Sequence, residues 1–311
     1  MSGEDSNLSS ISRRNDRIAG CVVGLAVGDA LGAPLEFLSR REVRKRYPAG
    51  LREMIDSRLW RAGEYTDDTQ MALLIAESLL EKNGFQISDL SQRFQVWATT
   101  AKDVGIQTRA VVNMAGYLRD PGSCSARYHT AHPNSSAGNG AVMRCAPVAL
   151  FCLHSLDQLI EVSRASARVT HYDPRAQSSC VILNSWIQAA ICRGVRDGRA
   201  EAIALLNETE RSVWHRLEKI DAYGEDDIMS SGYTVHTLEA AAWSFLSTES
   251  YEEAVIRAAN LGDDADTVAA VCGALAGAFY GYATIPPKWR DQLLNEGRIR
   301  EIALRLGRAH T

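Results

Sequence analysis

The sequence is organised around Gly262-Asp263-Asp264-Ala265-Asp266-Thr267, which leads into residues 268–282, a segment without any charged side chain. An uncharged segment of this length is typical of a buried helix, so the acidic cluster at its start should lie near the interior. A similar cluster, Tyr65-Thr66-Asp67-Asp68-Thr69-Gln70, stands far away in the chain. Thr66 is placed to cap a helix whose apolar residues recur at helical spacing through position 79. We expect the two clusters to meet in space.

Two interpretations of these clusters are equally well supported by the pattern alone. Acidic residues suit the positive end of a helix dipole, so each cluster could simply be a helix cap. Carboxylates gathered in a partly buried place, however, repel one another and stay ionised only if cations neutralise them. Hard oxygen ligands favour Mg²⁺, Mn²⁺ or Ca²⁺ over zinc, and so many of them could hold two ions.

The composition bounds the class of protein. A chain of 311 residues with 46% hydrophobic residues can bury a substantial core, and its net charge of −4 argues against a general nucleic-acid binder. Seven cysteines without CxxC spacing fit a reducing compartment, so we expect a cytoplasmic protein. Residues 1–12 are polar and lack the apolar core of a signal peptide, which predicts a disordered tail followed by a single domain over residues 13–311.

The apolar run at residues 268–285 is about long enough to span a bilayer. Ala and Gly dominate it, an acidic cluster precedes it and no second run accompanies it. We therefore interpret it as the central helix of a soluble protein, in which Gly273 and Gly277 allow neighbouring helices to approach closely.

The remaining chain is also helical in pattern. Residues 16–31 predict a buried helix rich in small residues, in which Asp29 is more readily explained as a structural hydrogen-bonding residue. Residues 40–46 contain five basic side chains and are typical of a solvated helix face. Because no alternating strand pattern occurs, the prediction is an all-α protein, a single compact orthogonal bundle of roughly a dozen helices.

Two connections between helices could contact a ligand. Residues 134–140 end in Gly138, Asn139 and Gly140 and open directly into a predicted helix over residues 141–151, where free backbone amides would suit a phosphate. An ordinary loop with a helix cap is the simpler explanation of one Gly-Asn-Gly. His171 lies on a tight connection before the next predicted helix, where a ligand could reach it, although a lone histidine is usually structural.

Several motifs, taken together and in order, resemble the ADP-ribosylglycohydrolase family. The resemblance extends from about residue 17 to about residue 287. That family includes dinitrogenase reductase-activating glycohydrolase and the ADP-ribosylarginine and ADP-ribosylserine hydrolases. The matching motifs are Arg17-Ile18-Ala19-Gly20, Gly28-Asp29-Ala30-Leu31-Gly32, Tyr65-Thr66-Asp67-Asp68-Thr69, Gly138-Asn139-Gly140-Ala141-Val142-Met143-Arg144, Thr170-His171 and Gly262-Asp263-Asp264-Ala265-Asp266-Thr267.

The resemblance implies an all-helical hydrolase that uses two Mg²⁺ or Mn²⁺ ions to remove ADP-ribose from a modified side chain. It implies that the metal ligands are Thr66, Asp67, Asp68, Asp264, Asp266 and Thr267. It implies catalytic roles for Asp67, Asp68, Asp264 and Glu36, the last as ligand, gate or acid/base. It implies that the residues contacting ADP-ribose are Gly138, Asn139, Gly140, His171 and Tyr233.

The resemblance leaves the leaving group open. The compact length and the paired aspartates look most like the ADP-ribosylarginine branch, with an O-linked serine conjugate or a small free ADP-ribose derivative as the runner-up. A non-catalytic ADP-ribose-binding or structural protein is a different class, and a metal-dependent phosphohydrolase that releases AMP is a third. The expected partners are an ADP-ribosylated protein and the product ADP-ribose, without nucleic acid or membrane.

Overall fold

The computed structural model describes the backbone of residues 3–309 and the side chains of residues 11–309. Helices make up the architecture, and within the described backbone the only β-type pairing is an isolated bridge between Gly138 and Tyr233. The all-α prediction is confirmed. The helices outnumber the predicted dozen because one- and two-turn helices, such as α11 and α12, occupy segments expected to be loops.

The α-helices are α1 (Gly3–Gly32), α2 (Arg40–Arg46), α3 (Asp67–Lys82), α4 (Ile87–Trp97), α5 (Ile106–Val112), α6 (Pro121–Ala131), α7 (Ala146–Phe151), α8 (Leu156–Arg168), α9 (Pro174–Arg193), α10 (Arg199–Ala204), α11 (Glu208–Arg211), α12 (His215–Glu218), α13 (Thr234–Leu246), α14 (Tyr251–Ala259), α15 (Ala265–Tyr280), α16 (Pro287–Gln292) and α17 (Glu296–Leu306). The 3₁₀ turns are η1 (Ala33–Leu35), η2 (Val142–Arg144), η3 (Ser212–Trp214), η4 (Ile220–Ala222), η5 (Glu225–Asp227) and η6 (Tyr282–Thr284).

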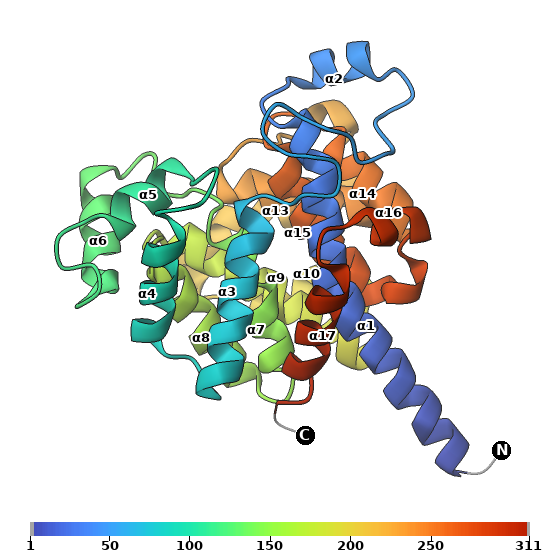
Figure 1. Cartoon of the computed structure of the whole chain (residues 1–311), viewed down its shortest axis with the longest axis horizontal. Helices are drawn as coiled ribbons and strands as arrows, with labels where there is room; N and C mark the ends of the chain where they lie inside the picture. The colour runs from blue at the N-terminus through green and yellow to red at the C-terminus, as the bar shows by residue number, and fades with distance from the viewer. Residues whose placement is uncertain (1–2, 310–311) are drawn as a thin grey trace.

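The centre of the fold is an antiparallel pair of helices, α1 and α15, which lie side by side in Figure 1. From Gly20 to Gly32, glycine recurs at every fourth residue of α1, and this spacing puts these four glycines on one face of the helix. A Cβ atom added to any of them would overlap the backbone of α15 or of the residues just after it. The contacts run in opposite directions along the two helices, pairing Gly20 with Gly277, Gly24 with Gly273, Gly28 with Ala269 and Gly32 with Ala265. The end of α1 therefore lies beside the start of α15.

Helix α3 is attached to the end of α1 through a buried carboxylate. Asp29 is fully buried and accepts hydrogen bonds from the backbone N–H of Thr66 at 2.9 Å and of Thr69 at 3.0 Å. The Thr69 hydroxyl donates a further hydrogen bond to it at 2.5 Å. The structural role predicted for Asp29 is thus confirmed, and the start of α3 is held beside the start of α15.

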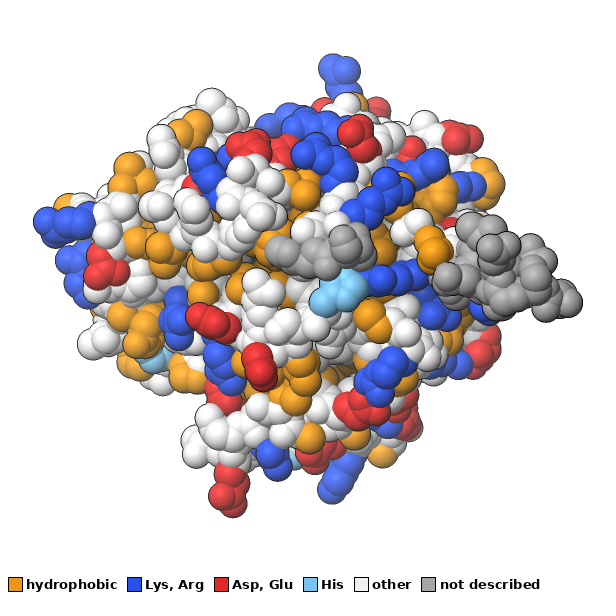
Figure 2. Space-filling view, turned by 90° about the horizontal axis from the view of Figure 1, so that it is seen from below, with side chains coloured by type: hydrophobic (Ala, Val, Ile, Leu, Met, Phe, Trp, Pro, Cys, Tyr) orange, Lys and Arg blue, Asp and Glu red, His pale blue; other side chains and the backbone are white. Residues whose placement is uncertain are grey.

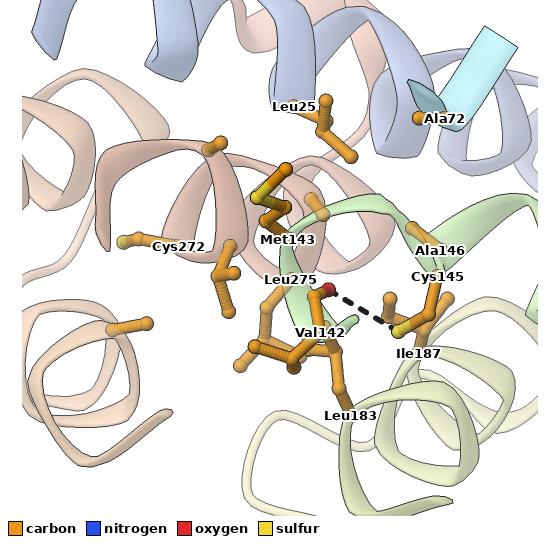
Figure 3. Close-up of a cluster of buried hydrophobic side chains, with 14 of the residues drawn as sticks. Leu25, Ala72, Val142, Met143, Cys145, Ala146, Leu183, Ile187, Cys272 and Leu275 are labelled. Atoms are coloured by element: carbon orange, nitrogen blue, oxygen red, sulfur yellow. Dashed lines mark hydrogen bonds between the residues drawn. The ribbon is translucent and has the colours of Figure 1, made fainter. Parts of the chain in front are cut away.

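The hydrophobic core explains why α15 carries so few charges. Figure 3 shows η2 and the start of α7 surrounded by side chains from helices far apart in the sequence, and the Cys145 thiol donates to the carbonyl of Val142 at 3.3 Å. Every residue of α15 from Ala265 to Ala278 is buried. Around Val142, Met143, Cys145 and Ala146, the other labelled members of this cluster are Leu25 from α1, Ala72 from α3, Leu183 and Ile187 from α9, and Cys272 and Leu275 from α15.

One described segment, Ile11–Leu35, is long and apolar enough to cross a membrane, with a mean hydropathy of 1.8, but 94% of its 18-residue apolar window is buried inside the protein. Its composition is that of a core helix packed on α15. The apolar run predicted over residues 268–285 is shorter as a helix, because Gly281, with φ of 92°, ends α15 after Tyr280.

Two predicted boundaries are corrected. Helix α1 begins at Gly3, within the segment expected to be a disordered tail, and residues 4–12 contain neither proline nor glycine to stop it. Residues 1 and 2 lie outside the described chain. The helix predicted over residues 141–151 is divided into η2 and α7, because Pro147 lacks the N–H that a continuous helix would need at that position.

The surface carries charges of both signs. On the face seen in Figure 2, Lys and Arg side chains lie interspersed with Asp and Glu and with hydrophobic groups. Helix α2, at the top of Figure 1, has the solvated character predicted for residues 40–46, with Val43 as its buried residue.

Candidate active site

The two acidic clusters meet, as the sequence predicts. Thr66 caps α3 and its hydroxyl lies 3.2 Å from Asp68 Oδ2. The hydroxyl of Thr267, in the first turn of α15, donates to the same carboxylate oxygen at 3.4 Å. A contact between residues 199 positions apart therefore joins the two helix starts directly.

A cavity of about 520 Å³ opens above this junction. It brings together ten of the predicted site residues: Glu36, Asp67, Asp68, Gly138, Asn139, Gly140, His171, Asp264, Asp266 and Thr267. Two predicted residues do not line it. Thr66 caps α3 and does not reach the cavity. Tyr233 lines an adjoining cavity of about 290 Å³ together with Arg175.

The charge in the main cavity is one-sided. Six carboxylates line it and no Lys or Arg does, among the residues that the structure describes. Burial, with repulsion from Asp103, raises the pKa of Asp67 to about 7. Burial, with repulsion from Asp264, raises the pKa of Glu36 to about 8. Burial also raises the pKa values of Asp68 and Asp266 well above the usual range, with neighbouring carboxylates adding to the shift. The cluster therefore lacks the positive charge that would stabilise its ionised form.

The donor chemistry fits a hard divalent cation. Asp68 is buried, and its Oδ1 atom has no hydrogen-bond partner among the described residues. A buried carboxylate oxygen is costly to leave unpaired, and a bound cation would supply the missing interaction. In the described part of the chain, however, no three His, Cys, Asp or Glu side chains form a ready-made ligand group. The oxygen ligands surround the cavity without converging on one point.

The loop containing Gly138, Asn139 and Gly140 is tied to the second acidic cluster. The Asn139 side-chain amide donates to Asp264 Oδ2 and to the Thr237 hydroxyl, each at 3.0 Å. Its backbone N–H donates to the carbonyl of Gly232 at 3.0 Å. The prediction of a cradle of free amides at a helix start is therefore wrong for Asn139, because tertiary pairing uses its N–H.

His171 reaches the cavity from a buried chain of hydrogen bonds. Arg144 Nη2 donates to the Thr170 hydroxyl at 2.7 Å, and that hydroxyl lies 2.8 Å from His171 Nδ1. Burial, with the nearby Arg144 charge, lowers the pKa of His171 well below its usual range, so the ring is neutral. The arrangement that uses every hydrogen has Thr170 donating to Nδ1, which leaves the ring proton on Nε2. Gly140 makes room for the ring, because an added Cβ would lie 2.8 Å from its Cε1 atom.

Thr170→Val should destabilise the protein by about 2 kcal/mol, because the fully buried Arg144 would lose its partner at Nη2. Thr170→Ser keeps the hydroxyl and should change the free energy of unfolding much less. Urea denaturation of the two variants measures the difference. Equal stability of both would show that the hydroxyl does not satisfy Arg144.

The structure adds residues that the sequence did not single out. Asp103, Gln107 and Thr108 line the cavity from the connection between α4 and α5 and from the start of α5. The Gln107 amide donates to the carbonyl of Thr170 at 3.1 Å, which fixes α5 against the His171 connection. An isolated Asp followed by Gly105 resembles any solvated turn, so local sequence carried no signal for Asp103.

The chain resembles proteins of one family over nearly its whole length. A family model described as ADP-ribosylglycohydrolase matches residues 10–311. An ADP-ribosylarginine hydrolase, Tri1, from Serratia proteamaculans (strain 568) is 34% identical over 301 residues, covering 94% of this chain and 79% of that protein. An ADP-ribosyl-dinitrogen reductase glycohydrolase from Rhodospirillum rubrum is 34% identical over 284 residues, covering 90% of each. A solved structure described as an ADP-ribosylglycohydrolase-related protein complex has a TM-score of 0.79 at 32% identity, covering 96% of this chain and 100% of that one.

Proposed function

Because the chain belongs to the ADP-ribosylglycohydrolase family, we propose that it hydrolyses the bond between ADP-ribose and an arginine side chain of a modified protein. The observation that carries the proposal is the cavity in which six carboxylates face the 138–140 loop and His171. Arginine is the proposed acceptor because the Tri1 relative is an ADP-ribosylarginine hydrolase at 34% identity. All seven cysteines are free thiols, which suits the proposed cytoplasmic location.

The proposed cofactor is a pair of Mg²⁺ or Mn²⁺ ions. The support is the all-oxygen donor set, the unpaired Asp68 Oδ1 and the lack of Lys or Arg in the described cavity lining. When bound, such ions would polarise a water molecule and the ribose hydroxyls. The residues proposed to hold them are Thr66, Asp67, Asp68, Asp264, Asp266 and Thr267.

The chain's own residues have different proposed roles on the two sides of the cavity. Water adds to C1″ of the ribose, the C1″–N bond breaks, and a proton passes to the leaving guanidine nitrogen. Glu36 or an aspartate of the clusters orients the water or exchanges that proton, since all of them line the cavity. His171 Nε2–H faces the 138–140 loop and is available to donate to the diphosphate. Tyr233 is proposed to contact the end of ADP-ribose that reaches the adjoining cavity.

Product analysis tests this function. Protein supplied with Mg²⁺ or Mn²⁺ should release free ADP-ribose from an arginine-ADP-ribosylated peptide, and EDTA should abolish the release. A matched serine-ADP-ribosylated peptide should be cleaved much more slowly. AMP as the product would indicate cleavage at the diphosphate instead. ADP-ribose binding without release from either peptide would identify a binding protein.

A further inference from the structure

A second cavity, of about 720 Å³, lies against the active-site cavity and shares part of its wall. Glu36, Phe37 and Asp103 line both cavities. The other walls of the second cavity come from η1, the end of α2 and the 55–60 connection, and none of them comes from the 138–140 loop. A molecule that occupies the first cavity with its diphosphate toward that loop would therefore extend past Glu36 and Phe37 into the second.

Phe37 lies on the boundary between the two cavities, and both its exposure and its backbone conformation are unfavourable. The residue is 82% exposed, although phenylalanine is among the residues most often buried in proteins. Its φ of 64° is in the left-handed region, which disfavours a bulky residue. Two backbone hydrogen bonds hold this conformation: Phe37 N–H donates to the carbonyl of Asp263, and Asp263 N–H donates to the carbonyl of Leu38, each at 2.7 Å. Strain of this kind, fixed by the surroundings, is characteristic of sites that contact a ligand.

The second cavity carries charge of both signs: Glu36, Asp56 and Asp103 line it, together with two cations that have no ion-pair partner among the described residues. Arg46 and Arg58 line it and are exposed, and within residues 11–309 neither has an ion-pair partner. Other cations nearby are occupied, because Arg44 pairs with Glu225 at 2.7 Å and Lys102 pairs with Glu64 at 2.6 Å. The Arg46 guanidinium lies over the Tyr47 ring, 5.6 Å from its centroid, and both guanidinium groups remain exposed and would attract acidic side chains.

We propose that this second cavity is the acceptor groove, in which the polypeptide carrying the ADP-ribosyl group binds. Phe37 contacts the modified arginine side chain, and Arg46 and Arg58 contact acidic residues that flank it in the target. This inference rests on the proposed function. In that reaction the arginine leaving group must lie on the far side of the carboxylates from the diphosphate.

The test compares three substrates: ADP-ribosylarginine, and two ADP-ribosylated peptides that differ only in having acidic or basic residues beside the modified arginine. The wild type should show a higher kcat/KM for the acidic peptide, and added salt should reduce that preference. Arg46→Glu/Arg58→Glu should lower the ratio of kcat/KM for the acidic peptide to that for the basic one by about tenfold. Arg13→Glu is the matched control, because Arg13 is exposed and lies about 28 Å from the end of α1 at 1.5 Å per residue.

Phe37 is tested by substitutions that separate the ring from the backbone. Phe37→Asn tolerates the left-handed conformation, so its Tm should equal or exceed that of the wild type, while kcat/KM for both peptides falls about tenfold. Phe37→Tyr retains the ring and should retain most of the kcat/KM. If the wild type turns over normally and the Arg46→Glu/Arg58→Glu variant has an unchanged ratio of kcat/KM for the acidic and basic peptides, the acceptor-groove proposal is overturned. The proposed function is then left intact. No release from any substrate by the wild type would overturn both.

Discussion

Asp67→Asn/Asp68→Asn is expected to reduce kcat for ADP-ribose release by about 10³-fold or more. Both side chains line the cavity, and Asp68 accepts hydrogen bonds from Thr66 and Thr267 at the point where the two helix starts meet. Asparagine preserves the shape of each side chain but is a much weaker cation ligand and cannot accept a proton from water. Initial rates at saturating substrate, with Mg²⁺ or Mn²⁺ present, measure the loss.

The same variant should remain folded. Burial raises the pKa values of Asp67 and Asp68, which means that their ionised forms are disfavoured in the metal-free protein. Removing both charges should therefore leave the Tm in EDTA unchanged or higher. Added Mg²⁺ should raise the Tm of the wild type, by an amount equivalent to about 2.7 kcal/mol at 100 times Kd, and should leave the variant unaffected.

Asp157→Asn is the matched control for this experiment. Asp157 also lies in the first turn of a helix, α8, but it is exposed and does not line the cavity. Its activity and its response to Mg²⁺ should equal those of the wild type. Retained hydrolysis by Asp67→Asn/Asp68→Asn would contradict the proposed site, because no step could then depend on either carboxylate.

The parts of the site that the sequence predicted are those with strong local signals. Thr66 followed by two aspartates predicts a capped helix start, and α3 begins there. The helix predicted after the His171 connection is α9, and Asp173 Oδ1 accepts from the N–H of Arg175 at 2.9 Å at its start. Each of these signals lies within one turn of the structure it specifies, so no knowledge of tertiary contacts was needed.

The parts that it missed depend on contacts between distant segments. Asp103 lies in a turn whose local sequence is that of a solvated loop, and only the packing of α5 brings it to the carboxylates. The N–H of Asn139 was expected to be free, yet the carbonyl of Gly232, 93 residues further on, accepts from it. Phe37 showed no signal, because its left-handed conformation is imposed by pairing with Asp263.

The glycine spacing of α1 is an intermediate case. Glycine at every fourth position from Gly20 to Gly32 indicates one helix face that another backbone approaches, and Gly273 and Gly277 repeat the spacing in α15. The two patterns predict close packing, but they do not specify which helices pair or in which direction. The antiparallel pairing matters for function because it sets Asp29 and Glu36 beside the start of α15.

Gly24→Ala should therefore lower the free energy of unfolding by about 3 kcal/mol or more. The added methyl group would overlap the Gly273 carbonyl, which belongs to a backbone that cannot rotate away as a side chain can. It would also crowd the ring of Tyr251, whose hydroxyl donates to the Gly24 carbonyl at 2.9 Å. Relief requires α1 and α15 to separate, which opens the core along both helices and moves the two acidic clusters apart, so activity should fall together with stability.

Gly297→Ala makes the same chemical change in the opposite environment. Gly297 lies inside α17, and an added Cβ would have no atom within 4 Å. Alanine has the higher helix propensity, so this variant should gain about 0.5 kcal/mol at the second position of the helix. Urea denaturation of both variants should thus give shifts of opposite sign for one added methyl group. A Gly24→Ala protein as stable as the wild type would show that the two helices can part without loss, and that the contact between them does not position the carboxylates of the two acidic clusters.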